Sequence, residues 1–285
     1  MTSAGGTETG TLAIVGVGLL GGSVALAAKQ RGLYRHVIGI GRNAQRLQAA
    51  VDAGVIDSFA TDIAAVEPAW DLVVVGTPVD RIVDDVRAIA ELSRPGTLIT
   101  DVGSVKGAIC RDLATGLPDG VRFVGSHPLA GSEKRGFEVA TPELFDGRVC
   151  VVTPAVSSNA AAVQRTVSFW ETLGSRVVRM EPDAHDVALA TTSHVPHVVA
   201  AALAAALPES ERDLAATGFR DTTRIASGDP DLWVAILLEN AAAVEASFDR
   251  FGAALDAFRE AIRKGDAGEL KKHLELAKRS RDALM

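Results

Sequence analysis

The sequence predicts an α/β fold in which a doubly wound parallel sheet is followed by an all-helical domain. From residue 11 to about residue 180, short runs rich in β-branched residues alternate with segments of helical length, the pattern of repeated βαβ units. Beyond residue 181 the alternation stops and alanine-rich helical sequence replaces it. We therefore expect a sheet domain over residues 11–181 and a helical domain over residues 182–285, preceded by a disordered tail at residues 1–10.

The predicted strands are short and apolar, as strands buried on both faces of a parallel sheet are. In chain order they cover residues 12–15, 37–40, 72–75, 98–100 and 122–124, and further strands at 148–152 and 176–180 would extend the sheet. The helices predicted between them cover residues 21–31, 44–53, 79–92, 105–113 and 160–173.

Seven apolar residues of the helical domain recur with a spacing close to that of a coiled-coil seam. They are Leu237, Val244, Phe248, Phe251, Leu255, Phe258 and Ile262. A stripe of this kind on one long helix needs a surface to pack against. It either packs inside the helical domain or forms an interface between two copies of the chain.

Composition narrows the class of ligand. The 285 residues carry a formal net charge of -7 without a run of Lys or Arg, which argues against nucleic acid or an anionic membrane as the main partner and favours a small molecule. Cys110 and Cys150 stand in unrelated apolar contexts and are expected to be buried, in keeping with a reducing cytoplasm. The apolar run 195–207 is well short of the roughly 20 residues of a spanning helix, so we expect no membrane segment.

A glycine motif directly follows the first predicted strand. Gly16 permits the tight turn, Gly18 lets the backbone approach a pyrophosphate, and Gly21 allows the helix that contains Leu19 and Leu20 to pack closely. Because the motif has a strand before it and a helix after it, the sheet domain is predicted to be a Rossmann-type dinucleotide-binding domain.

The end of the second strand bears on the choice of cofactor. An acidic residue that binds the ribose 2′-hydroxyl of NAD is expected there, but the sequence has Gly41 followed by Arg42. A guanidinium can pair bidentately with a 2′-phosphate. This favours NADP, with NAD possible; the alternative is that Arg42 only stacks on the adenine and both cofactors bind.

Polar residues follow other strands at the edge where open α/β sheets bind ligands. Thr77 and Pro78 follow one strand, and Ser104 follows the next, where it either contacts a ligand or only caps a helix. His127 follows the fifth strand in a turn held by Pro128. A histidine at that edge can act as a general base, although a histidine in a turn is often purely structural.

The helical domain supplies candidate substrate contacts. His194 and His197 lie three apart on a helix expected to bend at Pro196. No nearby residues complete a metal site, so we assign substrate contact to His197 and packing to His194. Arg224 is the expected anchor for an anionic substrate; the alternative is a salt bridge to Asp221.

Several motifs together resemble the prephenate/arogenate dehydrogenase family of tyrosine biosynthesis. They are GVGLLGGS at 16–23, DVGSVKG at 101–107, GSHPLAGSEKRG at 125–136, SHVPH at 193–197 and TGFRDTTRIASGDPDLW at 217–233. The resemblance implies oxidative decarboxylation of prephenate to 4-hydroxyphenylpyruvate, or of arogenate to tyrosine. It also implies a homodimer formed through the helical domain.

The same resemblance implies roles for individual residues. His127 would withdraw the proton of the ring hydroxyl, and Ser104 would orient His127 and the nicotinamide end of the cofactor. Arg224 would hold a substrate carboxylate in a pocket lined by His197 and Trp233, with Glu133 and Asp221 in an ionic network near its mouth. Because Ser132 offers no carboxylate to the ammonium of arogenate, prephenate is favoured, though only slightly beside Glu133.

Two other functions are compatible with parts of the sequence. A β-hydroxyacid dehydrogenase also joins a Rossmann domain to a helical one, but that class relies on a lysine, and this chain has none between Lys134 and Lys264. A non-catalytic NADPH-sensing protein would keep the glycine motif without needing His127 together with Arg224.

Overall fold

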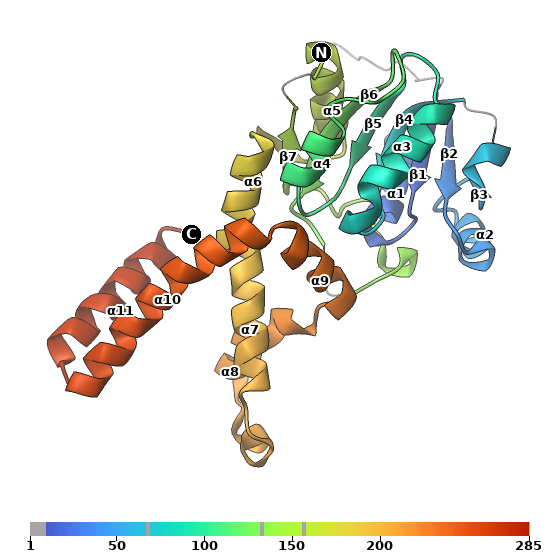
Figure 1. Cartoon of the computed structure of the whole chain (residues 1–285). Coiled ribbons are helices and arrows are strands. Elements are labelled where there is room, and N and C mark those ends of the chain that lie inside the picture. The colour runs from blue at the N-terminus through green and yellow to red at the C-terminus, as the bar shows by residue number, and fades with distance from the viewer. Residues whose placement is uncertain (1–9, 67–68, 132–133, 156–157, 285) are drawn as a thin grey trace, which may run out of the picture.

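The computed structural model describes residues 10–66, 69–131, 134–155 and 158–284. A twisted sheet flanked by helices forms one part of the molecule, and an extended group of helices, α6 to α11, forms the other (Figure 1). Ser132, Glu133 and most of the predicted tail lie outside the described residues.

The eight strands have the order β3-β2-β1-β4-β5-β6-β7-β8. The chain crosses from one side of β1 to the other between β3 and β4, which places a topological switch point beside β1. The strands are β1 (Thr11–Val15), β2 (His36–Ile40), β3 (Ser58–Ala60), β4 (Trp70–Val75), β5 (Leu98–Asp101), β6 (Arg122–Pro128), β7 (Val149–Thr153) and β8 (Arg176–Arg179).

Two features of the sheet differ from the prediction. The strand β3 was not predicted, because three residues are too few to show a periodicity. The sheet is also not wholly parallel: β7 runs antiparallel to β6, and β8 is parallel to β7. A parallel neighbour needs a crossover, usually a helix, whereas the described residues between β6 and β7 hold only the 3-10 turn Phe137–Val139.

The predicted helices of the sheet domain are present with small changes at their ends. They are α1 (Leu19–Gln30), α2 (Ala44–Asp52), α3 (Ile82–Leu92), α4 (Gly107–Asp112) and α5 (Ala160–Thr172). The chain enters α3 through a 3-10 turn at Val79–Arg81, and α4 begins two residues later than predicted.

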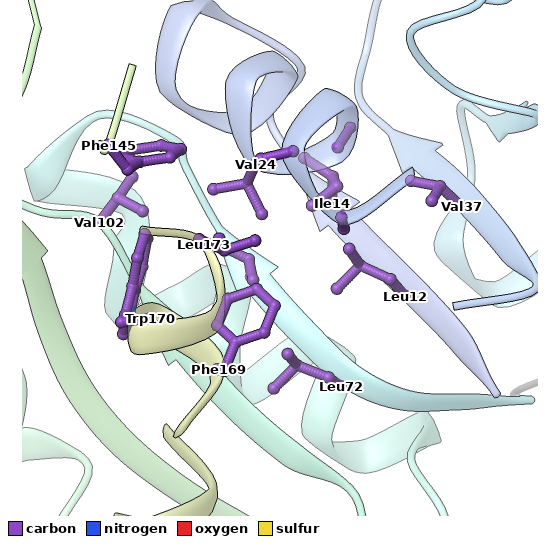
Figure 2. Close-up of a cluster of buried hydrophobic side chains, with 14 of the residues drawn as sticks. Leu12, Ile14, Val24, Val37, Leu72, Val102, Phe145, Phe169, Trp170 and Leu173 are labelled. Carbon is purple, nitrogen blue, oxygen red and sulfur yellow. The ribbon is translucent and has the colours of Figure 1, made fainter. Parts of the chain in front are cut away.

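Both faces of the sheet are buried, since successive side chains of a strand point to opposite faces. Leu12 and Ile14 belong to one buried cluster with Val24 of α1 and with Phe169 and Trp170 of α5 (Figure 2). On the other face, residues of β4 and β5 pack against α3, and Ile236 of the helical part joins that cluster. The two cysteines are free and buried.

The helical part begins with a long column (Figure 1). The column consists of α6 (Pro182–Leu189) and α7 (Val195–Ala205), joined by a π-helical stretch at Ala190–His194. By length and composition alone this helix could cross a membrane, which the sequence did not lead us to expect; interior helices of soluble proteins pass the same test. Four of its polar side chains are buried within the molecule: His185, Asp186, His194 and His197.

The remaining helices are α8 (Thr217–Thr223), α9 (Pro230–Glu239), α10 (Ala241–Lys264) and α11 (Ala267–Asp282). The hairpin of α10 and α11 leans away from the column (Figure 1).

The predicted apolar stripe does not lie on one helix, because Leu237 belongs to α9 and Asn240 separates it from α10. Its first members, Leu237, Val244 and Phe248, pack within the chain. Farther along α10, Phe251, Leu255 and Ile262 are exposed, Ile262 to 65%.

Candidate active site

The glycine motif forms the connection between β1 and α1. Gly16 has a φ of +90°, and a Cβ added to it would lie 2.8 Å from the carbonyl of Gly76. A Cβ on Gly21 would lie 2.3 Å from the carbonyl oxygen of Gly16, so both glycines are required by close backbone packing. A Cβ on Gly18 would meet nothing within 4 Å. The loop is therefore open at Gly18, where the backbone can approach a ligand.

A cleft of about 600 Å³ lies beside this loop. It is lined by six of the predicted cofactor residues, namely Gly16, Gly18, Gly41, Arg42, Thr77 and Pro78. The hydroxyl oxygen of Thr77 is buried and has no hydrogen-bond partner among the described residues. Such an orphaned polar atom on the wall of a cleft fits a ligand that would hydrogen-bond to it.

The predicted residues Leu19, Leu20 and Gly21 do not line the cleft. They form the first turn of α1, which has no side-chain cap and no acidic residue. The backbone N–H groups of such a turn lack partners within the helix and suit a phosphate.

The adenosine end of the cleft is positively charged. No carboxylate follows β2; instead Arg42 and Arg46 both line the cleft, and Arg46 lies 3.9 Å from Glu138. Two acidic residues, Asp62 and Asp85, line the same cleft, and Oδ1 of Asp62 accepts the N–H of Ala64. Together with the open glycine loop, these residues fit a nicotinamide dinucleotide. Arg46, four residues beyond Arg42, was not among the predicted cofactor residues.

His127 lies on β6 and not in a turn, contrary to the prediction. It pairs with Val151 of β7, and Pro128 is the last residue of the strand. The side chain is 9% exposed and stands at the edge where β1, β4 and β5 also end. Burial lowers the pKa of His127 well below its usual value, and the nearby His185 and Lys106 lower it further. The ring is therefore neutral at pH 7 and can accept a proton.

A buried network braces β5 and β6 beside this histidine. Asp101 and Lys106 are both wholly buried and form an ion pair. Asp101 Oδ1 accepts the N–H of Ser126 at 3.0 Å, and Oδ2 accepts the N–H of Gly103 at 2.8 Å. Both charged residues belong to the motif at 101–107, in which only Ser104 was predicted to have a role.

Ser104 follows β5 and is partly exposed. It does not cap α4, because that helix begins at Gly107 and its N-cap position is Lys106. In the described part of the chain no hydrogen bond joins Ser104 to His127, whose Nδ1 lies 2.9 Å from Nε2 of His185. The orienting role of Ser104 remains a prediction for the complex with ligands.

The helical part brings two predicted substrate residues together. The rings of His197 and Trp233 are stacked, with centroids 3.5 Å apart and an angle of 13° between their planes. His197 is 6% exposed, its Nδ1 has no hydrogen-bond partner among the described residues, and burial lowers its pKa. By contrast, His194 contacts Asn240 at 3.1 Å, and burial lowers its pKa to about 4. His197 is thus the one of the pair with an unused polar atom.

Arg224 opens a 3-10 turn at Arg224–Ser227, directly after α8, which carries Asp221. Both side chains are exposed. Whether Arg224 anchors a substrate or pairs with Asp221 remains a prediction.

Two further residues connect the domains. Arg135, which lines the cofactor cleft, forms an ion pair with Asp229, and Asp229 caps α9 by accepting the N–H of Asp231. The wall of the cleft is thereby tied to the helix that carries Trp233.

Comparison with known proteins gives a consistent result along the chain. The model for the prephenate dehydrogenase nucleotide-binding domain matches residues 24–179, and the model for the prephenate dehydrogenase dimerization domain matches residues 181–276. Prephenate dehydrogenase of Bacillus subtilis is 35% identical, covering 96% of this chain and 76% of the relative. Cyclohexadienyl dehydrogenase of Zymomonas mobilis is 34% identical, covering 96% and 95%.

Among solved structures, prephenate dehydrogenase of Aquifex aeolicus in complex with hydroxyphenyl propionate and NAD+ is similar over 98% of this chain and 99% of its own. The TM-score is 0.91 and the sequence identity 33%.

Proposed function

The chain belongs to the prephenate dehydrogenase family, and we propose that it catalyses the NAD(P)-dependent oxidative decarboxylation of prephenate to 4-hydroxyphenylpyruvate in tyrosine biosynthesis. One observation carries the mechanism: a buried, neutral histidine, His127, stands at the strand edge that also bears the dinucleotide cleft. A general base needs a free lone pair at the operating pH.

The chemistry divides between the cofactor and His127. When bound, the nicotinamide accepts the hydride from the ring carbon that bears the hydroxyl. His127 accepts the proton of that hydroxyl, so a carbonyl forms there. The bond between the ring and its carboxylate then breaks, CO2 leaves, and the electron pair makes the ring aromatic. His127 returns the proton to the resulting phenolate, which balances the reaction.

The helical domain holds the substrate in this proposal. Arg224 pairs with a carboxylate, because its planar guanidinium suits bidentate contact. His197 and Trp233 form the wall of the pocket, and the unpartnered Nδ1 of His197 supplies a hydrogen bond to the side chain of the substrate. Asp221 belongs to an ionic network near the mouth of the pocket in this proposal, and Ser132 and Glu133, which lie outside the described residues, stay predicted substrate contacts. Because Ser132 offers no carboxylate to an ammonium, prephenate is preferred over arogenate.

NADP is the preferred cofactor in this proposal. Arg42 and Arg46 line the cleft where a 2′-phosphate would lie, and no acidic residue directly follows β2. Loss of an arginine pair of this kind removes charge-assisted hydrogen bonds to the phosphate but leaves the rest of the dinucleotide site unchanged.

We place the enzyme in the cytoplasm as a homodimer formed through the helical domain. The match to a dimerization domain indicates self-association. Three large apolar side chains of α10, Phe251, Leu255 and Ile262, are exposed in the single chain. A second copy would cover such a patch, because exposed apolar patches commonly mark interfaces.

The decisive test compares initial rates with prephenate and with arogenate, each with NAD and with NADP. We expect a rise in reduced-nicotinamide absorbance that is fastest with prephenate and NADP. No rise in any of the four reactions contradicts the function, whereas a faster reaction with NAD or with arogenate corrects only the cofactor or the substrate preference.

A further inference from the structure

We propose that His185 and Asp186 form a positioning pair that keeps the proton of the His127 ring on Nδ1 and leaves Nε2 free to accept the proton of the substrate. The role rests on the proposed function, because it concerns the base of that reaction. The pair lies in the first two turns of α6, outside every motif discussed above.

The three side chains form a continuous chain of short contacts. His127 Nδ1 lies 2.9 Å from Nε2 of His185, and His185 Nδ1 lies 2.8 Å from Oδ1 of Asp186. His185 is fully buried and Asp186 is 7% exposed. Two buried rings and a buried carboxylate at these distances must hydrogen-bond to one another, since water cannot replace the bonds.

The donors around Asp186 decide where the protons lie. Its Oδ1 accepts the backbone N–H of Lys106, and its Oδ2 accepts the backbone N–H of Gly107, both at 2.8 Å. Because the carboxylate accepts at both oxygens, His185 Nδ1 must be the donor of the third bond. A neutral imidazole carries one N–H and one lone pair. In the proposed arrangement His185 carries a single N–H, so its Nε2 is an acceptor and His127 donates to it from Nδ1.

A proton on Nδ1 determines the state of the other ring nitrogen of His127, Nε2. With Nδ1 protonated, Nε2 of the neutral ring holds the lone pair, which is the arrangement a general base requires. The same logic, a carboxylate fixing the tautomer of a base, operates in serine proteases, where disturbing it lowers kcat by about 10⁴-fold. Here one further histidine stands between the carboxylate and the base.

The charges around His127 are consistent with a neutral ring. It faces Lys106 and His194 in addition to His185, and both lower its pKa. The carboxylate nearest to its strand, Asp101, is paired with Lys106. When His127 takes a proton from the substrate, the new positive charge is stabilised through His185 by the carboxylate of Asp186.

The pair also joins the domains at the reaction centre. His127 belongs to the sheet, whereas His185 and Asp186 belong to the first helix of the helical domain. The contact with α4 depends on Gly107, because a Cβ there would lie 2.8 Å from Oδ2 of Asp186. The base is thus set in its working tautomer only while α6 is docked on α4.

The first experiment reads the tautomer without any substrate. Histidine labelled with ¹⁵N in the ring is incorporated into the full-length protein, and the signals of His127 are assigned by comparison with His127→Asn. At pH 7.5 we expect a protonated Nδ1 and a non-protonated Nε2. A proton on Nε2 overturns the proposal, whatever the activity of the enzyme.

The second experiment uses a matched pair of variants. In His185→Gln the side-chain oxygen reaches the place of Nε2 and still accepts from His127, whereas the shorter His185→Asn leaves the Nδ1–H of His127 unpaired. We expect kcat to fall roughly 100-fold in His185→Asn and less than about 10-fold in His185→Gln, within the range of general acid–base effects. KM and the dissociation constant of NADP should stay within about twofold of wild type.

Equal losses of kcat in the two variants indicate a merely structural residue and overturn the proposal. If wild type shows the expected tautomer but turns over neither prephenate nor arogenate, the proposed function fails while the positioning pair stands. If a variant does not fold, the tautomer measured in the wild-type protein still tests the proposal.

Discussion

The dinucleotide cleft and the cluster formed by His127, His185 and Asp186 are built in opposite ways. The cleft is open, positively charged at one end, and shaped by glycines that lie within six residues of each other in one loop. The cluster is buried and joins His127 to His185, which is 58 residues away, and His185 to Asp186. A site made of backbone groups can be encoded by a short local motif. A site made of side chains from two domains forms only when the domains pack together. Changes in the cluster should therefore affect turnover, and changes in the cleft should affect cofactor choice.

The largest effect is expected at the base itself. His127→Asn removes the proton acceptor, so kcat should fall by roughly 10² to 10⁴-fold, the range for general acid–base catalysis. Steady-state kinetics measure the loss, and titration of protein fluorescence with NADPH measures cofactor binding. If the variant also bound NADPH more weakly, the histidine cluster and the dinucleotide cleft would not act independently.

The second largest effect is expected on stability, when the buried ion pair of Asp101 and Lys106 is broken. Lys106→Met leaves the carboxylate of Asp101 buried without its cation, which should lower the free energy of unfolding by roughly 3–5 kcal/mol. Unfolding in urea measures it. The exposed pair of Lys278 and Asp282 is the control, since Lys278→Met should change stability little. Equal effects in the two variants would show that the Asp101–Lys106 pair is not important for stability.

The cleft provides a smaller and more selective effect. The double variant Arg42→Ala/Arg46→Ala should reduce the ratio of kcat/KM for NADP to that for NAD by roughly 10 to 100-fold, because two charge-assisted contacts to a 2′-phosphate are lost. The exposed Arg87→Ala on α3 is the control. An unchanged ratio in the double variant would contradict the assignment of this end of the cleft.

The substrate anchor should change binding more than chemistry. Arg224→Ala is expected to raise KM for prephenate about tenfold with little change in kcat, as loss of a contact made equally in ground and transition states does. Arg212→Ala, at an exposed arginine outside the proposed site, is the control. A lower kcat with an unchanged KM would mean that Arg224 acts in the transition state instead.

The smallest change is expected in the dependence of kcat/KM on pH. A base loses activity as the pH falls through its pKa, and the pKa of His127 lies well below 6.5 because of burial. The kcat/KM should therefore stay constant as the pH falls from 8 to 6.5 and decline only at lower pH. A decline centred near 6.5 would indicate a solvent-exposed base. Since His127→Asn has no such base, its residual activity serves as the reference.

The same contrast explains what could be predicted from the sequence. The strands, the helices and the glycine loop depend on local periodicity and backbone conformation, so seven of the eight strands, the helices of the sheet domain and the glycine loop beside the cleft were predicted. The direction of β7 was not, because it depends on a connection without a helix. His127 was expected in a turn held by Pro128, but the strand β6 continues through His127 and ends at Pro128.

The interior of the site could not be predicted for a physical reason. His185-Asp186 reads as an ordinary helix start behind a proline, and nothing local shows that it meets a strand 58 residues earlier. Likewise, the pairing of Asp101 with Lys106 becomes informative only when both are seen to be fully buried.

The central claim is that removal of the hydride, with the hydroxyl proton passing to His127, is followed by loss of CO2 in the same active site, and the stoichiometry of the products tests it most directly. With prephenate and NADP, the account predicts equal amounts of NADPH, CO2 and 4-hydroxyphenylpyruvate. Reduced cofactor formed without CO2 would identify a simple alcohol dehydrogenase and contradict it.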